Sequence, residues 1–567
     1  MTPTWTTALP DWERRIVARE SLIPFAPLFP KEAAAGMAVL DQLRVVDMPG
    51  SPQFGEVSEP WVRDFCASIF GAYDLETGCR LVREWLMLIS KKNTKSTTAG
   101  ELMLAILLRN WRKAGEFGIL APTVEVANNA FKPAADAIRA DDELSDLLHV
   151  QDHIRTITHR VTKATLQVVA AESETVAGKK WIVTLVDELW LFGKKANAED
   201  MLREATGGLA SRDEGCVIYL STQSNEPPAG VFKQKLDYAR GVRDGRIVDP
   251  QFCPVLYEFP PKMIAAGEHL KPENFYITNP NMGHSVNEAF LVREFGKAQE
   301  GGAESLRGFL AKHLNVEIGL ALQGNRWAGA AFWESAAWSR RPAVETLGLP
   351  RVLDLAAIIE LSDVLTIGID GGGLDDMLGL SVIGRDARTG DWLTYGKAWV
   401  HRCVLERRKE IAPRLLDFEK DGDLIIIDDD STEDVTAVAD ICEQLHGTGL
   451  LATIGVDPVG IGAILDELEA RGIPRDMIHG ISQGWKMAGA IKTMERKLAA
   501  HQMWHGDRPL MAWCVGNAKV EPRGNAILIT KQAAGTAKID PVSALINAAE
   551  LMSRNPQGQR SFWEAAA

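Results

Sequence analysis

Apolar and polar residues follow two rhythms along the chain, and their order predicts an α/β protein. Short, wholly apolar runs rich in β-forming residues stand at 85–89 (WLMLI), 181–186 (WIVTLV) and 216–220 (CVIYL). Such runs are typical of strands buried on both faces of a sheet. A helical pattern covers 96–109, soon after the first run. Because strand and helix patterns alternate, we expect a parallel sheet with crossover helices.

A second block of strand patterns begins near residue 365. The expected strands are 365–370 (LTIGID), 378–386, 391–400, 424–427 and 451–456. A turn at Thr389-Gly390 joins the second and third of them. The segment 542–552 has the pattern of an amphipathic helix. These patterns predict a second α/β domain.

The chain is expected to consist of two domains with an arm and a tail. Its 567 residues suit two or more domains. A helical, tryptophan-rich region ends in Ser-Arg-Arg-Pro at 339–342, which places a junction near residue 345. The expected segments are an arm (1–50), a first domain (51–345) with linker helices from about 295, a second domain (346–555) and a tail (556–567).

The composition is that of an ordinary folded protein, with 46% hydrophobic and 24% charged residues. No apolar run reaches the roughly 18 residues of a transmembrane helix. The first residues lack the pattern of a secretory signal, so the protein is expected to stay where it is made. Seven cysteines without a CxxC pair indicate reduced thiols. The net charge of −14 disfavours a dedicated non-specific DNA binder but permits local basic patches.

A lysine-rich loop, SKKNTKST, lies between the strand pattern at 85–89 and the following helix. Loops in this position cradle phosphates with backbone N–H groups. Lys95 would reach the β- and γ-phosphates, and the hydroxyl of Ser96 would hold Mg²⁺. The usual pattern has glycine where Ile89 and Thr94 stand, so a basic surface loop remains an alternative. The predicted ATP-binding residues of the loop are Ser90, Lys91, Lys92, Asn93, Thr94, Lys95, Ser96 and Thr97.

Two further strand ends favour a nucleotide pocket. The strand pattern at 181–186 ends in Asp187-Glu188. Asp187 would bind Mg²⁺, and the catalytic Glu188 would activate the attacking water; the alternative is an acidic pair that caps the next helix. Ser221-Thr222-Gln223 follows the strand pattern at 216–220 and is either a γ-phosphate sensor that couples hydrolysis to movement or a polar turn.

Three separated aspartates in the second block predict a metal-dependent catalytic site. Asp370 and Asp457 each end an apolar strand pattern, and Asp540 precedes the helix at 542–552. Carboxylates that converge at one sheet edge can bind two divalent metals and clamp a phosphodiester. Asp376 is a further candidate ligand. The alternatives are an N-cap at Asp540 and a turn at Asp457.

The run Asp428-Asp429-Asp430 also follows a strand pattern and competes with Asp457 as a source of ligands. It ranks lower because runs of like charge usually form solvated loops. Whether Asp428 or Asp429 contributes to the metal site therefore stays open.

Together and in this order, the motifs resemble the large terminase subunits of tailed bacteriophages from about residue 50 to 555. The loop SKKNTKST is similar to the family's phosphate-binding loop, and WIVTLVDE to its acidic strand. Trp61 stands in a segment similar to the adenine-side segment, although its usual glutamine is not evident. IGIDGGGLDD, IGVDPVG and KIDPVSALINAAELM are similar to the three acidic segments of the nuclease. The resemblance implies an ASCE-type P-loop ATPase with a parallel sheet, followed by an RNase H-like nuclease with a mixed sheet.

The resemblance also implies two linked activities in the host cell cytoplasm. ATP-Mg²⁺ hydrolysis would move double-stranded DNA through the portal into a procapsid, and a nuclease with Mg²⁺ or Mn²⁺ would cut concatemeric DNA. The expected partners are DNA, the portal protein, the small terminase subunit and further copies in a ring of five, without a membrane. Arg203 or Arg212 could complete a neighbour's ATP site. The rival functions are a P-loop translocase or helicase with a non-catalytic second domain, and a DNA- or capsid-binding structural protein with a decayed ATP site.

Overall fold

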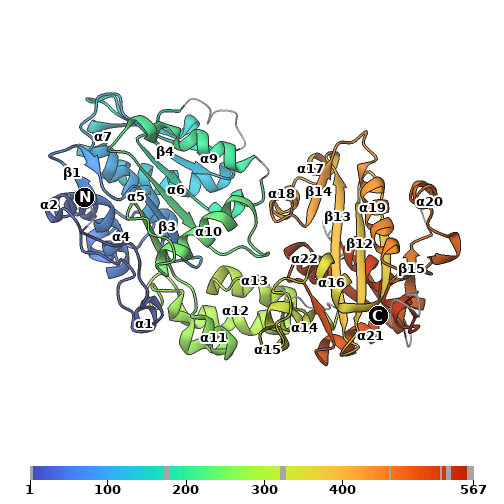
Figure 1. Ribbon diagram of the computed structural model, residues 1–567. Coiled ribbons are helices and arrows are strands. Elements are labelled where there is room, and N and C mark those ends of the chain that lie inside the picture. The colour runs from blue at the N-terminus through green and yellow to red at the C-terminus, as the bar shows by residue number, and fades with distance from the viewer. Residues whose placement is uncertain are drawn as a thin grey trace. The chain divides into compact units, whose positions relative to one another are not determined.

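A computed structural model of the chain (Figure 1) shows two compact units, Met1–Ile318 and Gly319–Ala567. The structure describes residues 4–171, 179–195, 197–318, 327–458, 462–523, 526–531 and 538–558. Most of the expected tail, 559–567, lies outside the described residues. The domain boundary expected near residue 345 stays a proposal. None of the described helices is both long and apolar enough to cross a membrane.

The first unit is built on an eight-stranded sheet with the order β10-β3-β9-β8-β4-β7-β6-β5. Its strands are β3 (Glu84–Leu88), β4 (Glu116–Ala121), β5 (Leu148–Gln151), β6 (Thr156–His159), β7 (Thr165–Ala170), β8 (Val183–Val186), β9 (Cys216–Ser221) and β10 (Phe252–Leu256). All pairs from β10 to β7 are parallel, which confirms the expected parallel sheet. The edge formed by β5 and β6 is antiparallel and had no counterpart in the prediction.

Helices connect these strands, as Figure 1 shows. They are α1 (Trp12–Val17), α2 (Pro30–Gln42), α3 (Phe54–Val57), α4 (Pro60–Phe70), α5 (Lys95–Leu108), α6 (Val124–Arg139), α7 (Asp142–Leu147), α8 (Leu189–Phe192), α9 (Ala198–Thr206), α10 (Gly230–Arg243), α11 (Pro261–Ala265), α12 (Glu288–Glu300) and α13 (Ala303–Leu314). A small hairpin of β1 (Tyr73–Asp74) and β2 (Cys79–Arg80) precedes β3. Helix α5 is buried along most of its length, so its apolar residues do not follow a single face.

The second unit contains a mixed sheet with the order β14-β13-β12-β11-β15-β16, and β17 pairs with β13. Its strands are β11 (Ser362–Gly371), β12 (Met377–Asp386), β13 (Trp392–His401), β14 (Leu424–Ile427), β15 (Leu451–Val456), β16 (Ile478–Gly480) and β17 (Met503–His505). β12 runs antiparallel to both neighbours, whereas β11 and β15 are parallel. The expected mixed sheet is therefore confirmed. A separate hairpin joins β18 (Ala518–Arg523) to β19 (Ala526–Lys531).

Helices cover both faces of the mixed sheet. They are α14 (Ala330–Trp333), α15 (Ala343–Thr346), α16 (Leu355–Leu361), α17 (Cys403–Arg407), α18 (Ala412–Lys420), α19 (Glu433–Gly447), α20 (Gly462–Ala470), α21 (Ala488–Ala499), α22 (Pro509–Asn517) and α23 (Asp540–Met552). Val364 belongs to the core with α21–α23, while its neighbour Leu365 belongs to the core with α16, α19 and α20. Successive residues of a strand face opposite sides, so β11 is buried from both.

Candidate functional site

The lysine-rich loop of the first unit connects β3 to α5 and is held in shape by asparagines. The amide of Asn93 donates to Ser90 O (3.1 Å) and to Asn279 Oδ1 (2.9 Å). Asn281 N donates to Asn93 Oδ1 (3.1 Å), and Asn281 Nδ2 donates to Thr94 Oγ1 (3.1 Å). These bonds tie the loop to a segment almost two hundred residues away in sequence. The loop is therefore a built part of the unit and not a free surface loop.

The backbone conformation at Thr94 shows why glycine is usual at this position of the loop. Its backbone is left-handed, with φ 57° and ψ 16°, directly before the first residue of α5. Glycine adopts this conformation readily, whereas a β-branched residue is strained in it. The loop thus keeps the shape for which the usual pattern has glycine, and the bond from Asn281 offsets part of the strain.

Lys95, Asp187 and Glu188 form a buried charged cluster at the carboxyl ends of parallel strands. Lys95 Nζ lies 2.5 Å from Glu188 Oε1 and 3.7 Å from Asp187 Oδ1. The side chains of Lys95 and Asp187 are 7% and 0% exposed. Asp187 Oδ2 is buried without a hydrogen-bond partner among the described residues. One carboxylate oxygen therefore faces the site with its acceptor capacity unused.

The electrostatics of the cluster follow from its burial. Burial raises the pKa of Asp187, and the Lys95 charge only partly opposes this. Burial also opposes ionisation of Glu188, but the charge and hydrogen bond of Lys95 outweigh it and lower the pKa of Glu188. Glu188 is thus the ionised member beside the ammonium group. A carboxylate held in this state can accept a proton from water or orient it.

The residues of the expected coupling triplet lie next to this cluster, because β9 stands between β3 and β8. Thr222 Oγ1 donates to Glu188 Oε2 over 3.4 Å. Ser221 Oγ accepts a bond from the backbone of Trp190 (3.0 Å), and Trp190 Nε1 donates to Glu188 Oε2 (2.6 Å). All three triplet residues are fully buried. The strand order thus brings the three predicted sequence motifs of the first unit together.

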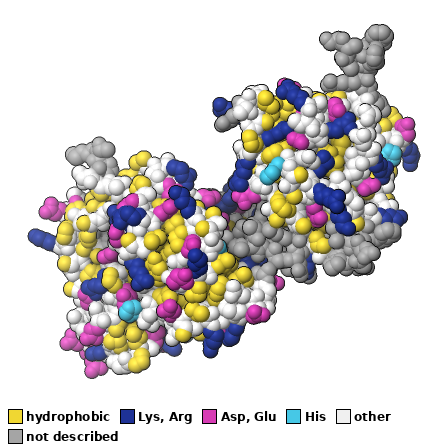
Figure 2. All heavy atoms as spheres, turned by 90° about the horizontal axis from the view of Figure 1, so that it is seen from below, with side chains coloured by type: hydrophobic (Ala, Val, Ile, Leu, Met, Phe, Trp, Pro, Cys, Tyr) yellow, Lys and Arg dark blue, Asp and Glu magenta, His cyan; other side chains and the backbone are white. Residues whose placement is uncertain are grey.

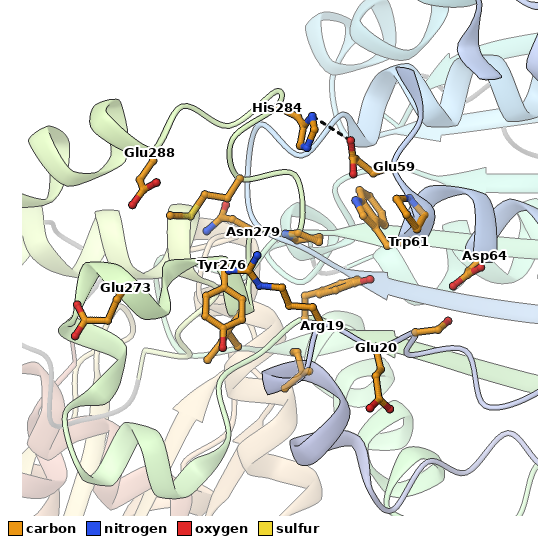
Figure 3. A pocket seen from close by; sticks show the side chains of 17 residues that line it. Arg19, Glu20, Glu59, Trp61, Asp64, Glu273, Tyr276, Asn279, His284 and Glu288 are labelled. Carbon is orange, nitrogen blue, oxygen red and sulfur yellow. Dashed lines mark ion pairs between the residues drawn. The ribbon is translucent and has the colours of Figure 1, made fainter. Parts of the chain in front are cut away.

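A cavity of about 560 Å³ lies beside the loop and includes Trp61 in its wall (Figure 3). Trp61 Nε1 donates to Asn281 Oδ1 (2.5 Å), and its ring meets that of Tyr257 edge-on at 5.7 Å. Figure 3 shows Arg19 beside Tyr276, with its guanidinium 4.2 Å from the ring centre. Trp61, Tyr257 and Tyr276 give the cavity an aromatic wall, and Asn279, which also lines it, accepts a bond from Asn93 of the loop (2.9 Å). This suits a planar base attached to a phosphate chain.

The predicted acids of the second unit meet through their backbones. β11 and β15 are parallel neighbours in which Ile369 pairs with Val456. Asp370 and Asp457, the next residues, therefore stand side by side, and Asp457 N donates to Ile369 O (3.4 Å). After Asp370 the chain turns through Gly371 and Gly372, whose φ values of 91° and 111° are accessible to glycine.

Asp540 reaches the same place from α23. Gly379 lies opposite Asp370 in the antiparallel pair of β11 and β12. A Cβ on Gly379 would lie 2.7 Å from the carbonyl carbon of Asp540, so the first turn of α23 can approach the sheet only because this residue is glycine. Asp540 is 2% exposed and is the first residue of the helix, where the dipole favours an anion.

The carboxylate groups of these aspartates do not form a ready metal site, although their backbones lie close together. Among the described residues, no three His, Cys, Asp or Glu side chains form a group that could hold a metal ion as it stands. Asp376 Oδ1 accepts a bond from Lys538 Nζ (2.5 Å), which also donates to Asp375 O (2.8 Å). Convergence of Asp370, Asp376, Asp457 and Asp540 on a shared cation therefore stays a prediction.

The rival acids after β14 lie at the same sheet edge, beyond β12 and β13. The side chain of Asp428 is 74% exposed and lies 3.2 Å from Arg402 Nε. Asp429 accepts a bond from Cys403 N (2.7 Å). These contacts are those of a solvated loop.

The surface is electrically mixed. Figure 2 shows basic and acidic side chains of the described residues interspersed on the face in view. Arg203 on α9 is 72% exposed and lies 3.5–3.7 Å from Asp200 and Glu199. Arg212 is half-buried, in the turn before β9. The exposed guanidinium of Arg203 can reach another molecule more readily than that of the half-buried Arg212.

Comparison with known proteins finds one matching family model and several similar proteins. Residues 425–555 match the profile of the family described as terminase large subunit, endonuclease domain. The chain is thus similar to the large terminase subunits of bacteriophages, and it consists of an α/β unit with a largely parallel sheet followed by an α/β unit with a mixed sheet.

Individual relatives extend beyond the nuclease segment. The large terminase subunit of Enterobacteria phage HK97 is 22% identical over 493 residues, which cover 86% of this chain and 87% of that protein. Protein YmfN of Escherichia coli strain K12 is 23% identical over 295 residues, 49% of this chain and 58% of that protein. The crystal structure of the HK97 large terminase has a TM-score of 0.46 at 19% identity and covers 92% of this chain and 99% of that one.

Several residues at these sites were not found from the sequence. They are Trp190, Asn279, Asn281, Lys312 and Asn315 in the first unit and Lys538 in the second. Most come from segments without a recognisable motif and reach the sites through tertiary contacts. Lys538 is the exception, because it stands two residues before Asp540 and the spacing alone could have drawn attention to it.

Proposed function

We propose that this protein is a DNA-packaging enzyme that hydrolyses ATP to translocate double-stranded DNA and cuts that DNA with a metal-dependent nuclease. The observation that carries the proposal is the buried cluster of Lys95, Asp187 and Glu188 at the carboxyl ends of parallel strands. A buried ammonium next to two carboxylates is costly unless it serves a charged ligand or a tight ion pair. The loop and helix N-terminus beside it suit a phosphate chain.

Each residue of the first site has a part in that reaction. Lys95 would leave Glu188 to contact the β- and γ-phosphates, and Glu188 would then orient the attacking water. The unused Asp187 Oδ2 and the hydroxyl of Ser96 would hold Mg²⁺, which neutralises phosphate charge when bound. Trp61 and its cavity would receive the base. Thr222, which contacts Glu188, would sense the γ-phosphate.

In the second unit, Asp370, Asp457 and Asp540 would hold Mg²⁺ or Mn²⁺. Their all-oxygen donor set is that preferred by hard divalent cations, which in nucleases stabilise the attacking and leaving oxygens of the phosphodiester. The close approach at Gly379 supports this, since it lets the first turn of α23, which carries Asp540, lie against the residue opposite Asp370. Asp376, held by Lys538, would position the loop after β11 or join the ligands.

The proposed partners follow from packaging. Double-stranded DNA is the substrate, the portal protein of the procapsid receives it, and the small terminase subunit selects it. Copies of the chain would form a ring, in which the exposed Arg203 is better placed than Arg212 to enter a neighbour's ATP site. Host cytoplasm is the proposed location.

Nucleotide binding and hydrolysis test the first site. Lys95→Ala is expected to lose ATP turnover and weaken ATP-Mg²⁺ binding, since it removes the phosphate-contacting charge. Lys262→Ala, an exposed lysine on α11, is the matched control and should behave as wild type. Normal turnover in Lys95→Ala would disprove the assignment of the loop, and absence of turnover in wild type with DNA and portal-bearing procapsids would favour a structural protein with a decayed site.

Plasmid cleavage tests the second site. Wild type should cut plasmid DNA with Mn²⁺ or Mg²⁺, while Asp457→Asn should not, because it loses a ligand charge. Asp428→Asn, on the solvated loop, serves as the control and should cut normally. One rival is a translocase with a non-catalytic second unit. That rival requires packaging without cleavage in wild type and no effect of Asp457→Asn.

A further inference from the structure

Helix α13 enters the proposed ATP site through its C-terminal turn, in a segment to which no motif assigns a role. Lys312 Nζ donates to the carbonyl of Gln223 over 2.8 Å. Its Nζ also lies over the ring of Trp190, 3.0 Å from the ring centre. Both partners already belong to the site, since Gln223 ends the coupling triplet and Trp190 donates to Glu188.

The main chain at Gln223 is held on both sides by this turn. While Lys312 binds its carbonyl, Gln223 N donates to Asn315 Oδ1 (3.0 Å). Asn315 is 2% exposed and its amide donates in turn to Tyr257 O (3.0 Å). The positive φ of 47° at Asn315 ends α13 and turns the side chain toward the triplet. The backbone N–H and the carbonyl of Gln223 are thus both bonded to the end of α13, so the main chain at this buried residue is expected to move together with that turn.

The same turn is bonded to the phosphate loop. Lys91 N donates to Lys312 O (2.9 Å), and Asn279 Nδ2, whose oxygen accepts from Asn93, donates to His313 O (2.8 Å). Contacts of Lys312, His313 and Asn315 therefore connect the end of α13 with the loop, the triplet and the partner of Glu188. A change at the phosphates cannot displace one of these elements without straining the others.

Charge adds to this coupling. Burial lowers the pKa of Lys312 to about 6, with the nearby lysines 91, 194 and 95 acting in the same direction and Glu188 opposing them. A ligand that brings negative charge to the site would favour the protonated form and so strengthen the bond to Gln223 and the contact with Trp190.

We propose that Lys312 is a positioning residue that fixes the coupling triplet and Trp190, and through Trp190 the carboxylate of Glu188, to helix α13. The inference rests on the proposed ATPase function and deepens it. It makes the C-terminal turn of α13 the element that links the coupling triplet to the phosphate loop. Lys312 contacts no reacting atom in this account and acts only through its two partners.

Steady-state ATP hydrolysis of three variants tests the role. Lys312→Met keeps the apolar stem but loses the charge and the hydrogen bond, so kcat should fall about tenfold or more while KM stays within about twofold. Lys312→Arg keeps a cation over Trp190 and a donor for Gln223, and should recover most of the lost kcat. Lys297→Met on α12, whose side chain is 62% exposed and pairs with Glu294, is the matched control.

The possible outcomes separate this inference from the function on which it rests. Wild-type turnover that Lys95→Ala abolishes would retain the ATPase, and an unchanged kcat in Lys312→Met would then overturn the role of Lys312 alone. A rise in KM without loss of kcat would overturn it too, because it would make Lys312 a ligand-binding group. Equal losses in Lys312→Met and Lys312→Arg, with lowered Tm in both, would mark a purely structural residue and also overturn it. No turnover in wild type would overturn the ATPase itself.

Discussion

The acidic groups of the two units are held in opposite ways. In the first unit, Lys95 lies within ion-pair distance of Asp187 and Glu188, so the chain supplies its own counter-charge. In the second unit, the backbones of Asp370, Asp457 and Asp540 meet, but within the described residues their side chains form no group able to hold a metal. Like-charged carboxylates repel one another unless a cation joins them. The charged cluster of the first unit is therefore already assembled, whereas the three aspartates of the second unit are expected to draw together around a bound cation.

The largest expected effect is on ATP turnover and comes from substitution of Glu188, the ionised carboxylate of the cluster with Lys95 and Asp187. Glu188→Gln keeps the shape and the contact with Trp190 but removes the charge. ATP turnover should fall by about 10²–10⁴-fold while ATP binding persists, because the residue acts on water and not on the nucleotide. Turnover and equilibrium binding are measured side by side. Glu199→Gln on the exposed face of α9 is the control, and undiminished turnover in Glu188→Gln would remove its proposed role.

The second prediction addresses the three aspartates of the second unit. Without nucleotide, Mn²⁺ should raise the free energy of unfolding of the second unit in wild type by about 2.7 kcal/mol at one hundred times its Kd, and its Tm should rise accordingly. The gain should disappear in Asp540→Asn, since the helix-borne ligand is lost. Differential scanning calorimetry of both proteins with and without Mn²⁺ measures this rise in Tm. An equal gain in Asp540→Asn would mean that the cation binds elsewhere.

A third buried acid, Glu101, sharpens the contrast. Glu101 on α5 is fully buried, and neither oxygen has a hydrogen-bond partner among the described residues. Burial, aided by the charge of Asp47, raises the pKa of Glu101 well above 4.5. The pKa of Glu101 is thus higher in the folded state than in the unfolded state. The contribution of Glu101 to stability is therefore fully present below pH 4.5 and is lost as the pH rises through its folded-state pKa.

Glu101→Gln should therefore stabilise the protein by about 1–3 kcal/mol at neutral pH and by less near pH 4.5, the ordinary pKa of the group. Urea unfolding at both pH values measures the difference. Exposed Glu125 provides the control substitution, Glu125→Gln, which should leave stability unchanged at either pH. A gain that does not grow with pH would contradict the assignment of an uncompensated carboxyl group.

The smallest expected effect lies in the loop that precedes Lys95. Thr94→Gly relieves the left-handed strain of about 1 kcal/mol but loses the bond from Asn281, whereas Thr94→Ala loses the bond and keeps the strain. Thr94→Gly should accordingly be the more stable of the two by about 1 kcal/mol and should retain ATP turnover. Thermal unfolding of the two variants measures this difference in stability. Greater stability of Thr94→Ala would show that this backbone conformation is not strained.

Local patterns predicted much of this protein because the buried strands are short and wholly apolar. The strand ends at Asp187, Asp370 and Asp457 and the start of α23 were located from the sequence in this way. The expected strand at 181–186 begins only at Val183, and the ring of Trp181 instead occupies the space left open by Gly118. Such a contact depends on a strand sixty residues away and leaves no periodic signal.

What the sequence could not predict is tertiary. Lys312 and Gln223 are 89 residues apart, and Asn281 and Thr94 are 187 apart, so no motif joins them. The antiparallel pair β5 and β6 was missed because its strands are short and partly exposed. Asp376 was expected among metal ligands on spacing alone, without knowledge that Lys538 is bonded to it.

The central claim is that the chain carries two separate sites, one that needs Lys95 and one that needs Asp370. It is tested most directly by measuring ATP turnover and Mn²⁺-dependent plasmid cleavage on the same preparations of Lys95→Ala and Asp370→Asn. We predict that Lys95→Ala cuts DNA but does not hydrolyse ATP, and that Asp370→Asn hydrolyses ATP but does not cut. If each variant loses both activities, or if neither loses the activity assigned to it, the account of two sites is wrong.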